Sequence, residues 1–165
     1  MSNVVLIGMP GAGKSTVGVV LAKKLGYAFL DADLLIQSRE RKLLHEIISE
    51  RGVEGFWKVE ESVGESIETN RTVIATGGSA VYGPRAMEHY KQIGTVIYLS
   101  LPLAGIRERL GDLDERGVTL RDGQDLDGLY AERLPLYEKY ADITVACEGL
   151  GIREIVERIA CLLQQ

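Results

Sequence analysis

The sequence predicts a three-layer α/β fold in which helices cover both faces of a five-stranded parallel sheet. Short apolar runs alternate with longer amphipathic segments along the whole chain, and this alternation is typical of parallel strand–helix–strand units. A glycine-rich loop joins the first apolar run to the first amphipathic segment. The chain has 165 residues, 45% of them hydrophobic, and neither a repeat nor a linker divides it, so we expect one domain over residues 1–165.

The first two strands and their helices follow from apolar spacing. Residues 4–7 form an apolar run, and side chains at helical spacing predict a helix over about 13–25. Residues 28–30 form a second strand that ends at two aspartates. A largely helical region is then expected to extend to about residue 70, with a break near Gly52, because glycine is typical of a helix end.

The third and fourth strands have the same surroundings. Residues 73–75 are apolar and lead into two glycines, and a helix over about 84–92 precedes the fourth strand at 95–99. Pro102 suits the first turn of a helix, so we expect one up to about residue 110.

The last part of the chain begins with an interruption of the pattern. Residues 111–124 are polar and charged, contain three glycines and lack a period, so we interpret them as a mobile loop. A helix over 126–140, a strand over 143–145 and a helix over 152–163 with one apolar stripe complete the expected sheet and its cover.

Charge and hydropathy argue against two classes of function. The formal net charge is −5, whereas surfaces that bind nucleic acid are usually basic. No apolar run approaches the roughly 18 residues that a membrane span requires, and the start of the chain lacks a secretion signal. Cys147 and Cys161 are isolated, which is typical of reduced thiols. We expect a cytoplasmic monomer that acts on a small molecule and binds neither nucleic acid nor membrane.

Residues 8–15 have the form G-x-x-x-x-G-K-S between a strand and a helix. The glycines let the backbone curl and turn its N–H groups inward, and the helix start adds a positive dipole end. Lys14 can reach terminal phosphates, and the Ser15 hydroxyl can bind Mg²⁺. The motif predicts a nucleoside triphosphate site, with a plain glycine-rich turn as the alternative. The expected nucleotide-binding residues of the loop are Gly11, Ala12, Gly13, Lys14, Ser15 and Thr16.

Asp31 and Asp33 follow the second strand with one residue between them. Ligands of such folds lie beyond the carboxyl ends of the strands, so both carboxylates can face the phosphate loop. We expect Asp31 to hold Mg²⁺ through water, and Asp33 to orient an acceptor hydroxyl and take its proton. The alternative is that Asp33 caps a helix while Asp31 is exposed.

Several arginines could serve phosphoryl transfer. Arg107, Arg109, Arg116 and Arg121 lie in or beside the polar loop. We interpret this loop as a lid that closes over the nucleotide and brings positive charge to the transferring phosphoryl group. Solvated surface charges are the alternative.

Four further residues could form the acceptor side of the site. Gly77 and Gly78 follow the third strand and allow close backbone approach to a ligand, or only a tight turn. Arg133 could pair with an acceptor carboxylate or with an internal acid. Trp57 is either a core anchor or a wall of the acceptor pocket.

With these residues in place, the chain resembles the shikimate kinase family over nearly its whole length. The matching segments are residues 8–15, 29–33, 75–81 and 133–138. The resemblance implies a P-loop fold of the nucleoside-monophosphate-kinase type. It also implies an acceptor-binding helical region at about 33–62, a mobile lid at about 111–124, and ATP and Mg²⁺ as cofactors.

The resemblance implies roles for Asp31, Asp33, Gly78 and Arg133, and the residues themselves complete the expected set. Lys14 and Arg116 would stabilise the transferring charge, and Arg109 would join Arg116 at the nucleotide. Ser15 and Asp31 would hold Mg²⁺, and Asp33 would be the base. The residues that would contact the acceptor are Asp33, Trp57, Gly77, Gly78 and Arg133.

Three positions depart from the family pattern. Trp57 stands where the family has an arginine that clamps a carboxylate, Ser79 replaces a third glycine, and Gly117 replaces a proline after Arg116. Losing a charge-assisted contact to a carboxylate costs on the order of 2–4 kcal/mol. The nucleotide half of the expected site therefore matches the family, and the acceptor half is altered.

The sequence thus predicts an Mg²⁺- and ATP-dependent kinase that phosphorylates a hydroxyl of a small polar metabolite, with shikimate as the leading acceptor. Trp57 leaves another hydroxy acid or polyol open, such as homoserine or gluconate. A nucleotide-binding regulator without transfer activity is a third hypothesis, but it would need neither Asp33 nor Arg133.

Overall fold

The computed structural model describes residues 3–110 and 123–165, and these contain a five-stranded sheet in the order β2-β3-β1-β4-β5. Every pair of neighbouring strands is parallel, which confirms the fold class predicted from the strand–helix alternation. Each strand lies within one residue of its expected ends. The strands are β1 (Asn3–Ile7), β2 (Ala28–Asp31), β3 (Thr72–Ala75), β4 (Gly94–Ser100) and β5 (Ile143–Ala146).

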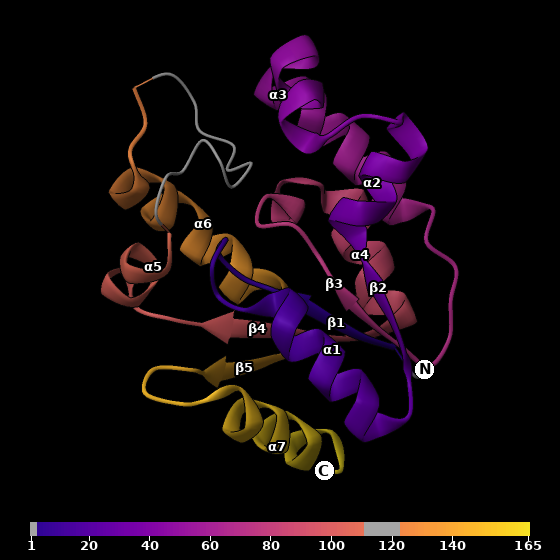
Figure 1. Cartoon of the computed structure of the whole chain (residues 1–165), viewed down its shortest axis with the longest axis vertical. Helices are drawn as coiled ribbons and strands as arrows, with labels where there is room; N and C mark the ends of the chain where they lie inside the picture. The colour runs from indigo at the N-terminus through magenta and orange to yellow at the C-terminus, as the bar shows by residue number, and fades with distance from the viewer. Residues whose placement is uncertain (1–2, 111–122) are drawn as a thin grey trace.

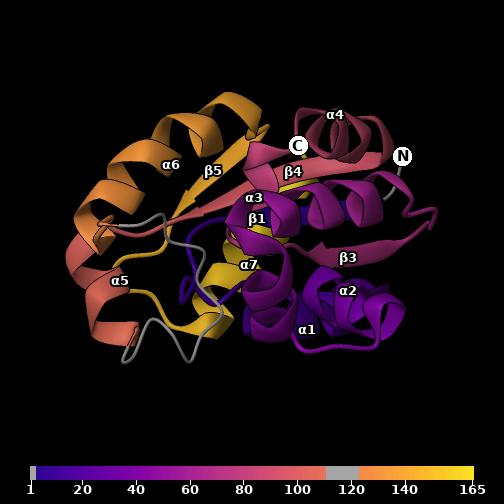
Figure 2. The same ribbon diagram turned by 90° about the horizontal axis from the view of Figure 1, so that it is seen from above.

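Helices cover both faces of this sheet. In Figure 2, α1 and α7 lie on one side of the strands, and α4 and α6 lie on the other. Figure 1 shows α2 and α3 together beyond one end of the sheet, opposite α5 and the start of α6. The helices are α1 (Lys14–Leu25), α2 (Ala32–Glu40), α3 (Leu44–Glu65), α4 (Pro84–Ile93), α5 (Leu103–Arg109), α6 (Leu126–Tyr140) and α7 (Ile152–Leu163), with a 3₁₀ turn, η1 (Ala80–Tyr82), before α4.

The expected helical region after the second strand consists of α2 and a kinked α3. Gly52 interrupts α3 with φ 75° and ψ 172°, which are not helical angles, so the predicted break is confirmed. The helix ends at Glu65, earlier than the expected end near residue 70. Beyond it the chain is not helical, because buried Ile67 packs into the main core on the way to β3.

The register of the sheet gathers the expected site residues at one edge. Leu6 of β1 pairs with Ala75 of β3 and with Ile97 of β4, and Asp31 of β2 also pairs with Ala75. The carboxyl ends of β1, β2 and β3 are therefore level. The segments that follow these ends are the phosphate loop, the start of α2 and the two-glycine turn before η1, which meet as the sequence predicted.

Two apolar clusters hold the chain together. The larger one is centred on β1, all of whose residues are buried, and it includes α1, α4 and α7. The smaller one joins α2 to α3 through Ile36, Ile47, Phe56, Val59 and Val63. Burial of such side chains contributes roughly 1.5–3 kcal/mol each. The smaller cluster fixes α2 and α3 relative to each other.

The expected lid and the expected lack of a membrane-spanning helix can be compared with the structure only over the described residues. The predicted lid at 111–124 lies outside the described residues except for Gly123 and Gln124, and Arg116 and Arg121 lie outside them altogether. Within the described ranges, no helix is long and apolar enough to cross a membrane.

Candidate active site

The loop between β1 and α1 curls around the ammonium group of Lys14. Gly11 and Gly13 adopt φ of +82° and +94°, which L side chains rarely tolerate. Lys14 Nζ donates hydrogen bonds to the carbonyl oxygens of Gly8, at 2.6 Å, and Met9, at 2.9 Å. Burial lowers the pKa of Lys14 to about 8, against an opposing effect of nearby carboxylates. The loop thus holds a cation at the start of a helix, as the motif predicts.

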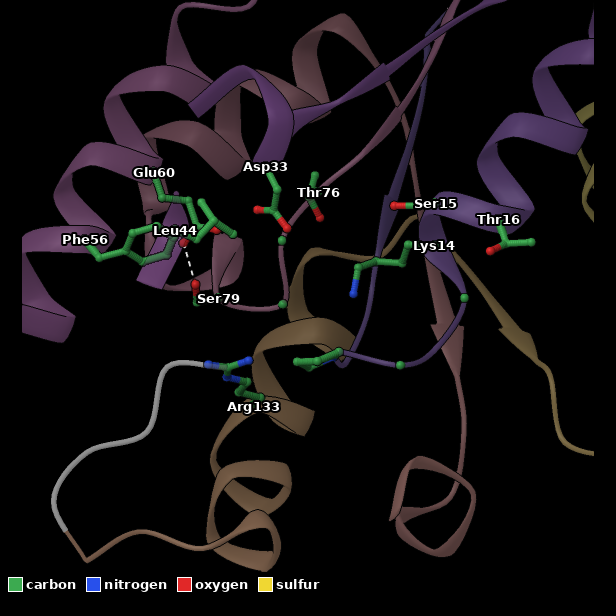
Figure 3. A pocket seen from close by; sticks show the side chains of 15 residues that line it. Lys14, Ser15, Thr16, Asp33, Leu44, Phe56, Glu60, Thr76, Ser79 and Arg133 are labelled. Carbon is green, nitrogen blue, oxygen red and sulfur yellow. Dashed lines mark hydrogen bonds between the residues drawn. The ribbon is translucent and has the colours of Figure 1, made fainter. Parts of the chain in front are cut away.

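A cavity of about 280 Å³ lies beside this loop. Figure 3 shows the side chains of Lys14, Asp33 and Arg133 pointing into the same space from α1, α2 and α6. The structure therefore brings together three residues selected from the sequence for different roles. The cavity is lined by Pro10, Gly11, Gly13, Lys14, Ser15, Thr16, Asp33, Leu44, Phe56, Glu60, Thr76, Gly77, Gly78, Ser79 and Arg133.

Asp31 links the phosphate loop to α2. Its Oδ2 accepts a hydrogen bond from Ser15 Oγ at 2.9 Å. Its Oδ1 accepts the backbone N–H groups of Asp33, at 2.9 Å, and Leu34, at 3.2 Å, and so caps α2. The alternative in which Asp33 is the cap is wrong, because Asp31 caps the helix and Asp33 lines the cavity.

Ser15 and Asp31 are suited to Mg²⁺, since a hydroxyl and a carboxylate oxygen lie side by side next to the phosphate loop. Mg²⁺ prefers oxygen ligands and is usually held by one or two carboxylates together with substrate phosphates and water. Within residues 3–110 and 123–165, no three histidine, cysteine, aspartate or glutamate side chains form a metal cluster. This donor set fits an ion that is shared with a nucleotide rather than caged by protein alone.

Asp33 is placed to accept a proton. It lies in the first turn of α2, directly after the Asp31 cap, and lines the cavity opposite Lys14. Burial, with a smaller effect of the Asp31 charge, raises the pKa of Asp33 to about 6, while Lys14 opposes the shift. The carboxyl is still ionised at neutral pH, and it is a stronger base than an exposed aspartate.

Glu60 is a second acid of the cavity, and the sequence pattern did not mark it as a site residue. It is 7% exposed, and its Oε1 accepts a hydrogen bond from Ser79 Oγ at 2.6 Å (Figure 3). Burial raises the pKa of Glu60 to about 8, although the Ser79 hydroxyl lowers it. Its helical spacing from Phe56 and Val63, which are apolar and buried, is the sequence signal that could have revealed a buried acid.

Gly77 and Gly78 pass between groups of opposite charge. A Cβ on Gly77 would lie 2.7 Å from both Asp33 Oδ1 and Glu60 Oε2, and a Cβ on Gly78 would lie 2.9 Å from Arg133 Nη1. Real Cβ contacts are almost never this short, so a side chain at either position would collide with its neighbours; the approach of this backbone to a ligand stays a prediction. Arg133 is 1% exposed, although it is an arginine in the middle of α6.

Trp57 is not among the described residues that line the cavity, whereas its neighbour Phe56 is. Its ring is half-buried, packs on the smaller apolar cluster, and stacks on Tyr82 with centroids 4.1 Å apart and planes at 15°. The role of Trp57 in acceptor binding therefore stays a prediction.

Arg109 lies on the other side of the phosphate loop. Its Nη1 donates to the carbonyl oxygens of Gly11 and Ala12, both at 3.2 Å. It lines a second cavity, which the loop shares with the start of α7. Thr16 lines both cavities, so the loop separates a space beside Arg109 from the space that contains Asp33 and Arg133.

The parallel sheet, the phosphate loop and the cavity with its aspartate and buried arginine define a P-loop kinase of small molecules. A family model described as shikimate kinase matches residues 10–164. The chain belongs to the shikimate kinase family, and the resemblance seen in the motifs is confirmed.

Named relatives match the chain over almost its full length. A shikimate kinase of Synechococcus sp. is 40% identical over 163 residues, which cover 96% of this chain and 82% of that protein. One of Persephonella marina is 36% identical over 160 residues, covering 96% and 97%. The structure of shikimate kinase from Acinetobacter baumannii in complex with shikimate has a TM-score of 0.84 and 30% identity, covering 99% and 93%. As a member of this family, the protein is a phosphotransferase that uses ATP and Mg²⁺ and acts on a hydroxyl group.

Proposed function

We propose that this kinase transfers the γ-phosphoryl group of ATP to a hydroxyl of shikimate, giving ADP and shikimate 3-phosphate. The observation that carries the proposal is the convergence of Lys14, Asp33 and Arg133 on one small cavity beside the phosphate loop. A carboxylate acceptor needs a buried cation at one end and a base at its reacting hydroxyl, and Arg133 and Asp33 supply these groups.

Asp33 would start the reaction by accepting the hydroxyl proton. The acceptor oxygen then forms its bond to the γ-phosphorus as the bond to the ADP oxygen breaks, and the proton stays on the Asp33 carboxylate. Lys14 would bring positive charge to the transferring group from the phosphate loop, and Arg116 is expected to add a second charge from the loop at 111–124. Such groups stabilise the charge that spreads over the phosphate oxygens in the transition state.

Mg²⁺ supplies charge neutralisation between the phosphate oxygens when it is bound. Ser15 and Asp31 would hold it, because their oxygens already meet at 2.9 Å beside the loop. Ala12, Gly13 and Thr16 would line the phosphates with backbone and side-chain donors, and Arg109 would border the base of the nucleotide in the second cavity.

At the acceptor, Arg133 would pair with the carboxylate while Gly77 and Gly78 let the backbone approach the ring. We further propose that the enzyme works as a monomer in the cytoplasm. The isolated positions of Cys147 and Cys161 in the sequence, typical of reduced thiols, support the cytoplasmic location.

The test is ADP release with Mg-ATP against shikimate, homoserine, gluconate and other small hydroxylated acids. Shikimate-dependent turnover at micromolar to millimolar concentration is the expected result, and mass spectrometry should identify the 3-phosphate. If only another acid is turned over, that acid is the acceptor and the proposal of shikimate is wrong, although the same phosphoryl transfer applies. ATP binding without turnover of any acceptor would overturn the proposal and leave a nucleotide-binding regulator.

A further inference from the structure

The guanidinium of Arg133 lies over an aromatic ring that is itself stacked on another. Its Cζ is 5.3 Å from the centroid of the Tyr82 ring. The same Tyr82 ring is stacked on Trp57, with centroids 4.1 Å apart and planes at 15°. The three side chains come from α6, η1 and α3, so the stack connects helices that border the cavity from different directions.

Arginine has a long side chain with many rotamers, and an anion-binding site gains affinity when its cation is held in place before the ligand arrives. An aromatic face attracts a cation above it, so the Tyr82 ring helps to hold the Arg133 guanidinium in place. Tyr82 can do this only if its own ring is fixed. Trp57 supplies that fixation, because offset stacking favours one ring orientation.

The position of Trp57 suits such an indirect role. It does not line the described cavity, but its neighbour Phe56 and the following Glu60 do. Trp57 also packs on the smaller apolar cluster between α2 and α3, so its side chain is held by that cluster as well as by Tyr82. A shift of α3 would therefore move the surface on which Tyr82 and Arg133 rest.

We propose that Trp57 is a positioning residue that acts through Tyr82 to hold Arg133 ready for the carboxylate of the acceptor. This inference rests on the proposed function, because it assumes that Arg133 binds the acceptor. It predicts a loss of acceptor affinity, and not of chemistry or of nucleotide binding, when the stack is removed.

Trp57→Ala is expected to raise the KM for shikimate about tenfold, with kcat and the KM for ATP nearly unchanged, since one well-packed aromatic pair is lost. Trp57→Phe retains a stacking ring and should restore the KM to within about threefold. The matched control is Val63→Ala, which removes a buried side chain of the same helix and cluster without touching the stack. If Val63→Ala raises the KM equally, Trp57 is only a core anchor and the proposal is wrong.

A double-mutant cycle tests the route through Tyr82. Tyr82→Ala should reproduce the rise in KM, and Trp57→Ala combined with Tyr82→Ala should cost no more than Tyr82→Ala alone, because both changes break the same connection. Additive effects would mean that Trp57 does not act through Tyr82. Trp57→Arg adds a cation but removes the stacked ring, so it should raise the KM; a lowered KM would show that position 57 contacts the acceptor directly.

Trp57 is the only tryptophan of the chain, so its emission reports on the stack. Shikimate should change the emission of the wild-type protein, and this change should disappear in Arg133→Gln while nucleotide binding persists. Wild-type turnover tests the proposed function, and the ratio of KM values tests Trp57. If the wild type turns over shikimate but the KM ratios are unchanged, only the positioning role of Trp57 is wrong. If no carboxylate gives either turnover or an emission change, both the proposed function and the positioning role are wrong.

Discussion

Ser79 Oγ donates a hydrogen bond of 2.6 Å to Glu60 Oε1 in the wall of the cavity beside the phosphate loop. This contact joins the two-glycine turn before η1 to α3, and it accounts for only one oxygen of a fully buried acid. The other oxygen, Oε2, approaches Gly77 from the same side as Asp33. The cavity therefore contains two acids whose pKa values are both raised, mainly by burial.

The first prediction concerns stability and Glu60. The pKa of this carboxyl rises from 4.5 to about 8 on folding, so the folded state binds more protons than the unfolded state between these values. Its contribution to stability is present below pH 4.5 and is lost as the pH rises toward 8. Glu60→Gln retains an oxygen for Ser79 and cannot ionise, so it should stabilise the protein at pH 8.5 by up to about 4–5 kcal/mol.

Denaturant unfolding of both proteins at pH 5 and pH 8.5 checks this, and Glu68→Gln, at an exposed position, is the matched control. The variant and the wild type should converge at the lower pH. A Glu60→Gln protein that is less stable at pH 8.5 would contradict the assignment of a costly buried charge.

The second prediction concerns Asp33. Removing a positioned general base typically lowers the rate 10²- to 10⁴-fold, so Asp33→Asn should reduce kcat by that factor with little change in ATP affinity. In the wild type, kcat/KM should fall as the pH drops below about 6, because the carboxyl must be ionised to accept the proton. Steady-state rates from pH 5 to pH 8 provide the measurement. The acid limb should be absent from the residual activity of the variant, and an unchanged kcat would remove the base role.

The third prediction separates the two roles of Asp31. Asparagine is as good a helix cap as aspartate, so Asp31→Asn should leave the free energy of unfolding nearly unchanged. It removes the negative charge next to Ser15, so the Mg²⁺ concentration for half-maximal activity should rise about 10- to 100-fold. Rates measured over a range of Mg²⁺ at saturating ATP test this. Asp31→Ala is the comparison, since it should lose the cap and about 1 kcal/mol as well.

The fourth prediction concerns Gly78. A methyl group there would lie 2.7 Å from Pro10 Cδ and 2.9 Å from Arg133 Nη1, so one of these groups must move. Gly78→Ala should cost about 1–3 kcal/mol of stability and should raise the KM for the acceptor more than the KM for ATP. Gly105→Ala, whose added Cβ would have its nearest neighbour at 3.4 Å, is the control that should change neither.

The sequence was sufficient for the sheet, because each apolar run and each helix preceding it obey the parallel alternation. The phosphate loop was also predictable, since G-x-x-x-x-G-K-S between strand and helix has one well-known geometry. Asp31 and Asp33 were placed at the right edge, but which of them caps α2 depends on the backbone angles at the strand end, and the spacing of two aspartates does not determine these.

The residues expected to bind the acceptor were harder to predict from the sequence, for a different reason. The hydrogen bond from Ser79 to Glu60 joins residues that are distant in the sequence. It forms only if α3 packs close to the two-glycine turn, and the sequence pattern does not determine that distance. Trp57 left two alternatives open because it lies at the border of the buried face of α3, where helical periodicity assigns neither burial nor exposure. The kink at Gly52 was predictable as a break, but the direction in which it turns the helix was not.

The burial of the Lys14 ammonium group in the phosphate loop has a consequence for the proton balance of nucleotide binding. With a pKa near 8, a fraction of the lysines in the free enzyme is neutral in mildly alkaline buffer. Phosphate oxygens next to the ammonium favour its charged form. Above pH 8, ATP binding should therefore be accompanied by the uptake of a proton from solvent onto Lys14. Calorimetric titrations in two buffers of different ionisation enthalpy would measure this uptake. Nucleotide affinity should therefore weaken in alkaline solution even though no phosphate group of ATP titrates there.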